Sequence, residues 1–332
     1  MTQPANANSL RRNILWILIP AVLAGLCGFY LFSGGGKTSA QAQAANGRKL
    51  VESRESLYNN IYIYSRGDYL SMTFGYNRNI YTESIYNTRD DRDLPVPYTR
   101  YMTASLIYAG QVKSILEIGF GGGRTSWYLH RYLPDVQVTS VELDPEIVRL
   151  AHKYFGIRDE PNFKVVNEDG RLFLANSKDK YDIILIDAYR GPFVPFHLLT
   201  REFYQLVKDR LAPGGVVAQN VEPSTMLFDS AVTTIKSVFS HLDFYVMEGN
   251  VVTIAYDGQE HNEADLARMA AERQKAYNLR YNLEDLLKQR RLFVTGGADA
   301  TVDPKAKALT DDFAPVESLK AITAHNRKWS EK

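Results

Sequence analysis

Cysteine is almost absent from this chain of 332 residues: the one cysteine, Cys27, lies in an apolar run. A disulfide framework and a CxxC metal or redox site are therefore excluded. The chain also lacks an excess of either charge, since 39 basic side chains stand against 38 acidic ones and the net charge is +1. No global field draws in nucleic acid, and no RNA- or DNA-binding motif is present. We expect neither a metal nor a nucleic-acid partner.

Apolar side chains are plentiful, at 45% of the residues, which suffices for one large core or two smaller ones. Residues 14–32 form a run without any charge. At about 1.5 Å per helical residue, such a run nearly matches a hydrocarbon core of roughly 30 Å. The run predicts a transmembrane anchor at 14–32 behind an N-terminal tail at 1–13, and hence a single-pass membrane protein with the lipid bilayer as a partner.

A cleavable signal peptide is the competing interpretation of this segment. Arg11 and Arg12 precede the run, and Ala40-Gln41-Ala42 resembles a cleavage site. The apolar run is long for a signal peptide, which favours the anchor. Basic residues on both sides leave the orientation open by the charge rule, and we expect the folded domain to lie on the cytoplasmic side. Residues 33–48, rich in Gly, Ser, Ala and Gln, predict a flexible linker.

Tyrosine is concentrated after the linker, with nine tyrosines between Tyr58 and Tyr101. Alternation over Tyr58–Tyr64 is typical of a strand, and residues 66–68 and 76–79 carry turn-forming side chains. The pattern predicts a small antiparallel β-meander in an N-terminal β domain at 49–110.

From Ser114 onward, short apolar runs alternate with amphipathic segments, which predicts an α/β fold with a doubly wound, Rossmann-like parallel sheet over 111–258. The expected strands are 114–118, 137–141, 163–166, 181–186 and 216–219, and the expected helices are 125–132, 145–155 and 201–211. A closing hairpin is expected at 244–256, turning at Gly249-Asn250. Residues 259–332 read as a C-terminal helical extension and tail, with Lys288–Arg291 as a solvated basic edge.

A glycine-rich turn follows the first strand of this domain, in the sequence Glu117-Ile-Gly119-Phe-Gly121-Gly-Gly123. Glycine permits a tight turn and a close approach of a ligand to the backbone at the carboxyl edge of the sheet. The sixth position is Arg124 rather than Gly, which argues against a nicotinamide dinucleotide site.

Acidic residues end the strands beside this turn: Glu117, Glu142, Asp169 and Asp187. Glu142, about 20 residues after the turn, can accept both hydroxyls of a ribose. Asp169, followed by Gly170, is a candidate for the adenine amino group, and Asp187 faces the same crevice. Together they predict a nucleoside site.

Four segments of this domain, EIGFGGG at 117–123, VELD at 141–144, EDGR at 168–171 and IDAY at 186–189, resemble the class I S-adenosylmethionine-dependent methyltransferase-type fold. More narrowly, they resemble the spermidine synthase (polyamine aminopropyltransferase) family. The resemblance covers most of 52–257, including Glu55–Asn59. Residues 197–204 and 309–317 are similar to a membrane-associated branch of that family.

The resemblance implies transfer of an aminopropyl group from decarboxylated S-adenosylmethionine to an amine acceptor, without a metal. By position, Glu142 holds the ribose, Asp169 with Gly170 the adenine, and Gly119, Gly121 and Gly123 the thionucleoside tail. Asp187 is the expected catalytic residue, because an amine with a pKa of about 10.4 needs a carboxylate to anchor it and to help remove its proton. Further substrate-binding candidates are Tyr58, Asn59, Tyr189 and Arg190.

Two positions depart from the family pattern. The family carries a second Asp three residues after the position of Asp187, where this chain has Arg190, and an Asp in the glycine turn, where Gly122 stands. Asp311, Asp312 and Glu222 are expected to be surface acids that do not replace them. His197 is expected to be a packing or capping residue.

Two other functions stay open at this point. A methyltransferase that uses intact S-adenosylmethionine fits Glu117 and the GxGxG spacing, and Arg190 suits the carboxylate of that cofactor. The third possibility is a non-catalytic, membrane-attached protein that binds a nucleoside or polyamine. The sequence leaves the oligomeric state undetermined, so a homo-oligomer is possible.

Overall fold

The computed structural model describes residues 47–312, apart from 77–78, 192, 226, 248 and 295–300. The predicted tail at 1–13, the predicted anchor at 14–32 and nearly all of the predicted linker lie outside these residues. Within the described ranges, no helix is both long enough and apolar enough to cross a bilayer.

The chain opens with a small antiparallel sheet in the order β1-β2-β3-β4, which confirms the predicted meander. Its strands are β1 (Lys49–Glu55), β2 (Asn60–Arg66), β3 (Tyr69–Tyr76) and β4 (Asn79–Asn87). The strand expected at Tyr58–Tyr64 begins two residues later, and β1 was not expected. β1 is exposed along nearly its whole length, so its sequence carries no alternation of apolar and polar side chains.

The second sheet has eight strands in the order β12-β10-β11-β9-β8-β5-β6-β7. The strands are β5 (Ser114–Ile118), β6 (Gln137–Glu142), β7 (Phe163–Asn167), β8 (Tyr181–Ile186), β9 (Leu211–Val221), β10 (His241–Met247), β11 (Asn250–Tyr256) and β12 (Arg290–Leu292). Five strands pair in parallel, in the order β7, β6, β5, β8 and β9. The strands β10, β11 and β12 join the sheet in antiparallel pairs. The order reverses between β5 and β8, where ligands bind in doubly wound folds.

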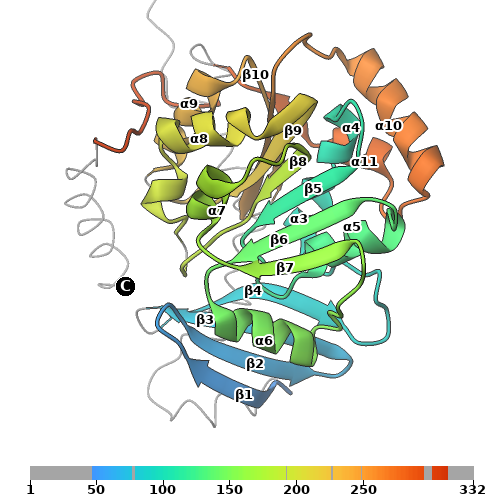
Figure 1. Ribbon diagram of the computed structural model, residues 1–332, viewed down its shortest axis with the longest axis vertical. Helices are drawn as coiled ribbons and strands as arrows, with labels where there is room; N and C mark the ends of the chain where they lie inside the picture. The colour runs from blue at the N-terminus through green and yellow to red at the C-terminus, as the bar shows by residue number, and fades with distance from the viewer. Residues whose placement is uncertain are drawn as a thin grey trace, which may run out of the picture.

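Helices cover both faces of the large sheet (Figure 1). They are α3 (Pro97–Met102), α4 (Ser105–Tyr108), α5 (Arg124–Tyr132), α6 (Pro145–Tyr154), α7 (Gly170–Asn176), α8 (Arg201–Asp209), α9 (Phe228–Val238), α10 (Glu263–Tyr277) and α11 (Leu283–Leu287), with a 3-10 turn at Phe196–Leu198. Helices α8 and α9 lie on one side of the sheet, and α4, α10 and α11 on the other (Figure 1). The predicted doubly wound sheet is confirmed.

The small sheet is packed onto the large domain. Ile61 and Met72 of the small sheet belong to the same buried apolar cluster as Trp127 and Phe155. Glu52 of β1 accepts hydrogen bonds from α6, including one of 2.6 Å from the Tyr154 hydroxyl. Because one core continues between the two sheets, a site between them has walls that are fixed relative to each other.

The C-terminal part of the sheet differs from the sequence prediction in two details. The hairpin β10–β11 forms as expected, but Met247 pairs with Asn250, so the turn lies one residue earlier. Arg290 was expected on a solvated edge, which is wrong. It lies in β12, and its guanidinium binds both carboxylate oxygens of Asp243 at 2.9 and 3.0 Å in a buried pair.

The predicted boundary at residue 110 assigns α3 and α4 to the N-terminal β domain. In the structure these helices pack against the large sheet, where the Tyr108 hydroxyl of α4 donates to Asp243 of β10 at 2.8 Å. The small sheet itself ends at Asn87.

Candidate active site

A cavity of about 710 Å³ opens at the carboxyl ends of β5, β6 and β8. Residues from the small sheet region, including Tyr58 and Glu83, form one wall, and the strand ends of the large sheet form the other. The volume lies within the range of small-molecule sites. The predicted site residues therefore have a single cavity in which they can meet.

The glycine-rich turn forms the floor of this cavity. Gly119 has φ +88°, and a Cβ atom there would lie 2.4 Å from the backbone oxygen of Asp187. Its N–H donates to Val141 O at 2.9 Å. Glycine at this position lets the ends of β5, β6 and β8 approach one another closely.

Gly122 shows why the turn carries no acidic side chain. A Cβ atom at this position would lie 2.7 Å from both Ser84 and the ring of Phe155. The Ser84 hydroxyl also accepts a hydrogen bond of 2.9 Å from the Gly122 N–H. The small sheet thus occupies the space where the family pattern has a carboxylate.

Glu142 ends β6 and lines the cavity. One carboxylate oxygen accepts from the N–H groups of Phe120 (3.0 Å) and Gly121 (3.2 Å), and the other from the Asp144 N–H (3.0 Å). Burial raises the pKa of Glu142, while these three bonds oppose the rise. The carboxylate therefore braces the glycine turn while it faces the cavity.

Asp169 begins α7 and also lines the cavity. Its Oδ1 accepts from the N–H groups of Arg171 and Leu172, as a helix N-cap does, and its Oδ2 lies 3.0 Å from His197 Nε2. The bond to His197 is the largest cause that lowers the pKa of Asp169. His197, expected to be a packing or capping residue, is instead a half-exposed cavity residue paired with Asp169.

Asp187 follows β8 and lies between two donors. The Tyr98 hydroxyl donates to Oδ2 at 2.9 Å, and the Asn220 side-chain amide donates to Oδ1 at 3.0 Å. Burial raises the pKa of Asp187 to about 6, against the effect of both bonds. Burial, with Asp187 nearby, also raises the pKa of Glu83 to about 8.

Most of the predicted site residues line the cavity: Tyr58, Asn59, Gly119, Gly121, Glu142, Asp169, Gly170, Asp187, Tyr189 and Arg190. Glu117 and Gly123 do not. Glu117 is buried in β5, where the Ser140 hydroxyl donates to it at 2.8 Å, and burial raises its pKa to about 8. Gly123 is the N-cap of α5, and a Cβ atom there would lie 2.3 Å from the Phe120 ring.

Four further residues line the cavity or bind Asp187 but were not predicted as site residues: Glu83, Tyr98, His197 and Asn220. Tyr98 follows Pro97 in the first turn of α3, and Asn220 lies in β9 next to the hairpin. Neither carries a motif, because each acquires its role through a tertiary contact with Asp187. The acids Asp311 and Glu222 are not among the residues that line the cavity, and Asp311 pairs with Arg171 at 2.5 Å.

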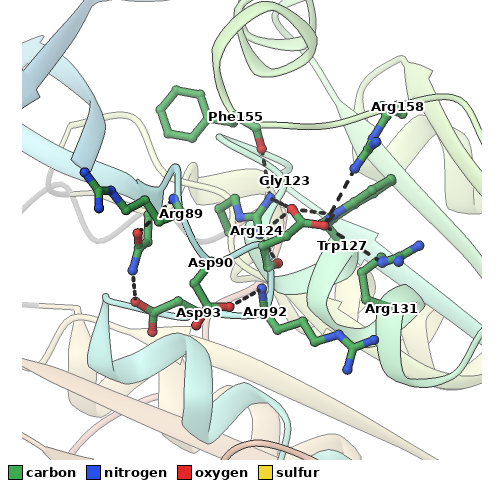
Figure 2. Close-up of polar contacts among 12 residues, drawn as sticks. Arg89, Asp90, Arg92, Asp93, Gly123, Arg124, Trp127, Arg131, Phe155 and Arg158 are labelled. Atoms are coloured by element: carbon green, nitrogen blue, oxygen red, sulfur yellow. Dashed lines mark hydrogen bonds and ion pairs between the residues drawn. The ribbon is translucent and has the colours of Figure 1, made fainter. Parts of the chain in front are cut away.

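Arg124, the residue that breaks the GxGxxG pattern, points away from the cavity. Its side chain is buried and donates to Phe155 O (2.8 Å) and to Asp91 O (2.5 Å) (Figure 2). The Asp91 carboxylate also accepts from the Trp127 indole N–H, at 3.0 Å to one oxygen. This cluster ties the loop between β4 and α3 to the start of α5, and so fixes the small sheet against the glycine turn.

The fold is a doubly wound α/β fold with a cavity at the switch point of the large sheet. The described residues contain no cluster of His, Cys, Asp or Glu suited to a metal. A family model described as "Spermine/spermidine synthase domain" matches residues 97–257. This segment of the chain is similar to the spermidine synthase family.

Two curated relatives and one solved structure are similar to this chain over most of its length. A polyamine aminopropyltransferase of Vibrio vulnificus (strain CMCP6) is 28% identical over 82% of this chain and 91% of its own length. A probable polyamine aminopropyl transferase of Bifidobacterium longum (strain NCC 2705) is 31% identical over 70% of this chain and 54% of its own. A crystal structure of a probable spermidine synthase from Corynebacterium glutamicum ATCC 13032 shares the fold, with a TM-score of 0.61 and 20% identity over 80% of this chain and 98% of that one.

Proposed function

We propose that this protein transfers an aminopropyl group from decarboxylated S-adenosylmethionine to a small amine acceptor, as a step of polyamine biosynthesis. The observation that carries the proposal is the pair of carboxyl groups, Asp187 and Glu83, on the cavity wall beside the glycine turn. An arriving ammonium group favours the ionised form of both acids, and in that form they attract the ammonium and repel the carboxylate of intact S-adenosylmethionine. The names of the curated relatives support the same activity.

The nucleoside is proposed to lie over the glycine turn, with its ribose on Glu142 and its adenine near Asp169. An ionised carboxylate offers about four acceptor positions. Three positions of Glu142 already accept backbone N–H groups, so two ribose hydroxyls would displace one of them. The bond from Gly121, at 3.2 Å, is the longest of the three.

Asp187 is proposed to anchor the acceptor amine opposite the sulfonium carbon. Tyr98 and Asn220 hold one oxygen each, which fixes the carboxylate and leaves further lone pairs for an ammonium. The reaction displaces the thioether from carbon: nitrogen donates its electron pair to the methylene carbon, and the carbon–sulfur bond breaks toward sulfur. Binding both partners in one cavity supplies the proximity that this step needs.

Methyl transfer is the second candidate, and Arg190 is the observation that favours it. This exposed arginine lines the same cavity, in a loop closed by its own N–H bonding to Phe193 O at 2.8 Å. A guanidinium at the mouth suits the carboxylate of intact S-adenosylmethionine. The acids deeper in the cavity argue the other way.

Calorimetric titration of the full chain in mild detergent separates the candidates. We expect tighter binding of decarboxylated S-adenosylmethionine than of the intact cofactor, and transfer to a diamine detected by mass spectrometry. Preference for the intact form would favour methylation. Binding of methylthioadenosine without any turnover would leave the non-catalytic binding function, and no binding of all three would reject the site.

We also propose that residues 14–32 anchor the chain in a membrane, with the catalytic domain on the cytoplasmic side. The support is the uncharged apolar run, and a linker that ends where β1 begins at Lys49. Extraction of membranes with alkaline carbonate, followed by protease treatment of sealed vesicles, tests both statements. Release by carbonate would reject the anchor.

A further inference from the structure

A β-bulge in the small sheet sets the position of Glu83. Met72 of β3 pairs with Ser84 of β4, and the next residue, Thr73, pairs with Thr82, so Glu83 has no partner in the register. A bulge adds one residue to a strand and redirects its side chain, and bulges are frequent beside active sites. Here the extra residue carries the carboxyl group that lines the cavity.

The same bulge joins Glu83 to the glycine turn. Its neighbour Ser84 accepts the Gly122 N–H at 2.9 Å and fills the space that a side chain at position 122 would need. Ser84 of β4 therefore leaves no room for an acid at position 122 of the turn, and the preceding residue, Glu83, presents an acid to the cavity. The position of Glu83 is fixed by this contact as well as by the sheet.

The carboxyl group of Glu83 is poorly satisfied within the protein. Its Oε1 atom is buried and has no hydrogen-bond partner. Buried polar atoms are usually paired, so an unpaired one at a cavity wall points to a missing ligand. An adjoining space of about 20 Å³, which is the size of one water molecule or one ammonium group, is lined by Glu83, Tyr98, Glu117 and Asp187 together with Arg124 and several uncharged residues.

We propose that Glu83 is the second carboxylate of the amine site: together with Asp187 it binds the acceptor's ammonium group, and it takes the proton that leaves the attacking nitrogen. This inference rests on the proposed function and names the residue that acts where Arg190 and Gly122 have replaced the family's acids. The small sheet, rather than the loop after β8, supplies the group.

The acceptor ammonium gives one proton to the Glu83 carboxylate, which becomes a neutral carboxylic acid, and the nitrogen becomes a neutral amine. The amine nitrogen forms a bond to the methylene carbon of the sulfonium while the carbon–sulfur bond breaks. The electron pair of the broken bond stays on sulfur. The products are a secondary ammonium and an uncharged thioether, so the positive charge has moved from sulfur to nitrogen.

The surrounding charges suit this role. Asp187, Glu117, Tyr98 and Tyr189 face the same region, and Arg190 lies at its mouth. Arg124 also borders the adjoining space, but its guanidinium is bound to Phe155 O and to Asp91 O. Burial and the charge of Asp187 raise the pKa of Glu83 to about 8, close to the pH at which a proton acceptor works best near neutrality. Arrival of a cation favours the ionised form of both acids.

The test compares Glu83→Gln with the wild-type full chain in mild detergent. Gln keeps the size of the side chain and removes its charge and basicity. We expect kcat/KM for the diamine to fall about 100-fold or more, while the KM for decarboxylated S-adenosylmethionine changes less than about threefold. Glu83→Asp should recover part of the loss. Glu55→Gln, an exposed acid of the same small sheet, is the matched control and should behave as wild type.

The pH profile distinguishes a chemical role from a structural one. An acid that must be ionised makes kcat/KM rise with pH through its pKa, so the wild type should rise around pH 8. Glu83→Gln should lose this rise and keep the one near pH 6 that belongs to Asp187. If the wild type transfers the aminopropyl group and Glu83→Gln shows the same kinetics and the same pH profile, the role of Glu83 is overturned while the proposed function stands. A wild type without transfer would overturn the proposed function, and this inference with it.

Discussion

Replacement of Asp187 by Asn should stabilise the protein while it abolishes transfer. Burial raises the pKa of Asp187 from 3.8 to about 6. The folded protein therefore holds this proton more tightly than the unfolded chain, and the free energy of unfolding falls as the pH rises from about 4 to about 6. A difference of about 2 pKa units, at about 1.4 kcal/mol each, costs the ionised folded protein about 3 kcal/mol at higher pH.

An amide at this position carries no charge at any pH, so the cost of burying the carboxylate disappears. The amide has one acceptor oxygen, however, so it cannot accept from both Tyr98 and Asn220 as the carboxylate does. One lost hydrogen bond costs about 1 kcal/mol. The expected net effect is about 2 kcal/mol of added stability at pH 8, and none, or a small loss, at pH 4.

Urea denaturation of both chains in the same detergent, followed by circular dichroism at pH 4 and pH 8, measures this difference. Turnover at pH 8 should fall at least 100-fold in parallel. Asp182→Asn is the control. Asp182 is a buried acid outside the cavity that accepts from the N–H groups of Lys113 and Ser114, so its replacement should destabilise at both pH values. Equal destabilisation of Asp187→Asn at pH 4 and pH 8 would refute the reasoning.

Three further substitutions test other parts of the site. Arg190→Asp should lower the KM for a diamine about tenfold relative to Arg190→Gln, because it exchanges a repelling charge for an attracting one; an unchanged KM would place this side chain outside the amine's reach. Glu142→Gln should weaken binding of methylthioadenosine about 10- to 100-fold in calorimetry, and equal affinity would contradict the ribose assignment. Arg124→Met should lower the free energy of unfolding by about 3 kcal/mol, because it leaves the acid Asp91 without its buried partner. Arg158→Met is the control: it removes an exposed partner of the same acid and should cost under 1 kcal/mol.

The large sheet could be predicted from the sequence because burial dominates its strands. All six residues of β8, Tyr181–Ile186, are buried, and its last four are apolar, as is typical of a central parallel strand. The acids at strand ends could be predicted for the same reason, because parallel strands bring their carboxyl ends to one edge. Glu142, Asp169 and Asp187 therefore meet in one cavity, as the spacing indicated.

Elements that depend on local exposure or on pairing across the fold could not be predicted in this way. β1 is a polar, exposed strand, so its hydrogen bonds to β2 leave no trace in its hydropathy. Arg290 is basic and lies in a charged stretch, yet the bidentate bond to Asp243 buries it. Without knowledge of the partner, the sequence favours solvent for such a side chain.

The position of the acids in the site illustrates the same limit. A motif describes residues that are close in sequence, whereas this cavity is closed by a strand of the small sheet. Gly122 looks like the loss of a carboxylate when the glycine turn is considered alone. With Ser84 against it, the same glycine is the condition under which β4 can approach the turn at 2.9 Å and bring Glu83 to the cavity. The glycine at position 122 removes a carboxylate from the turn, and the same glycine lets β4 bring the carboxylate of Glu83 to the cavity. An Asp at position 122 would therefore displace β4 rather than repair the site.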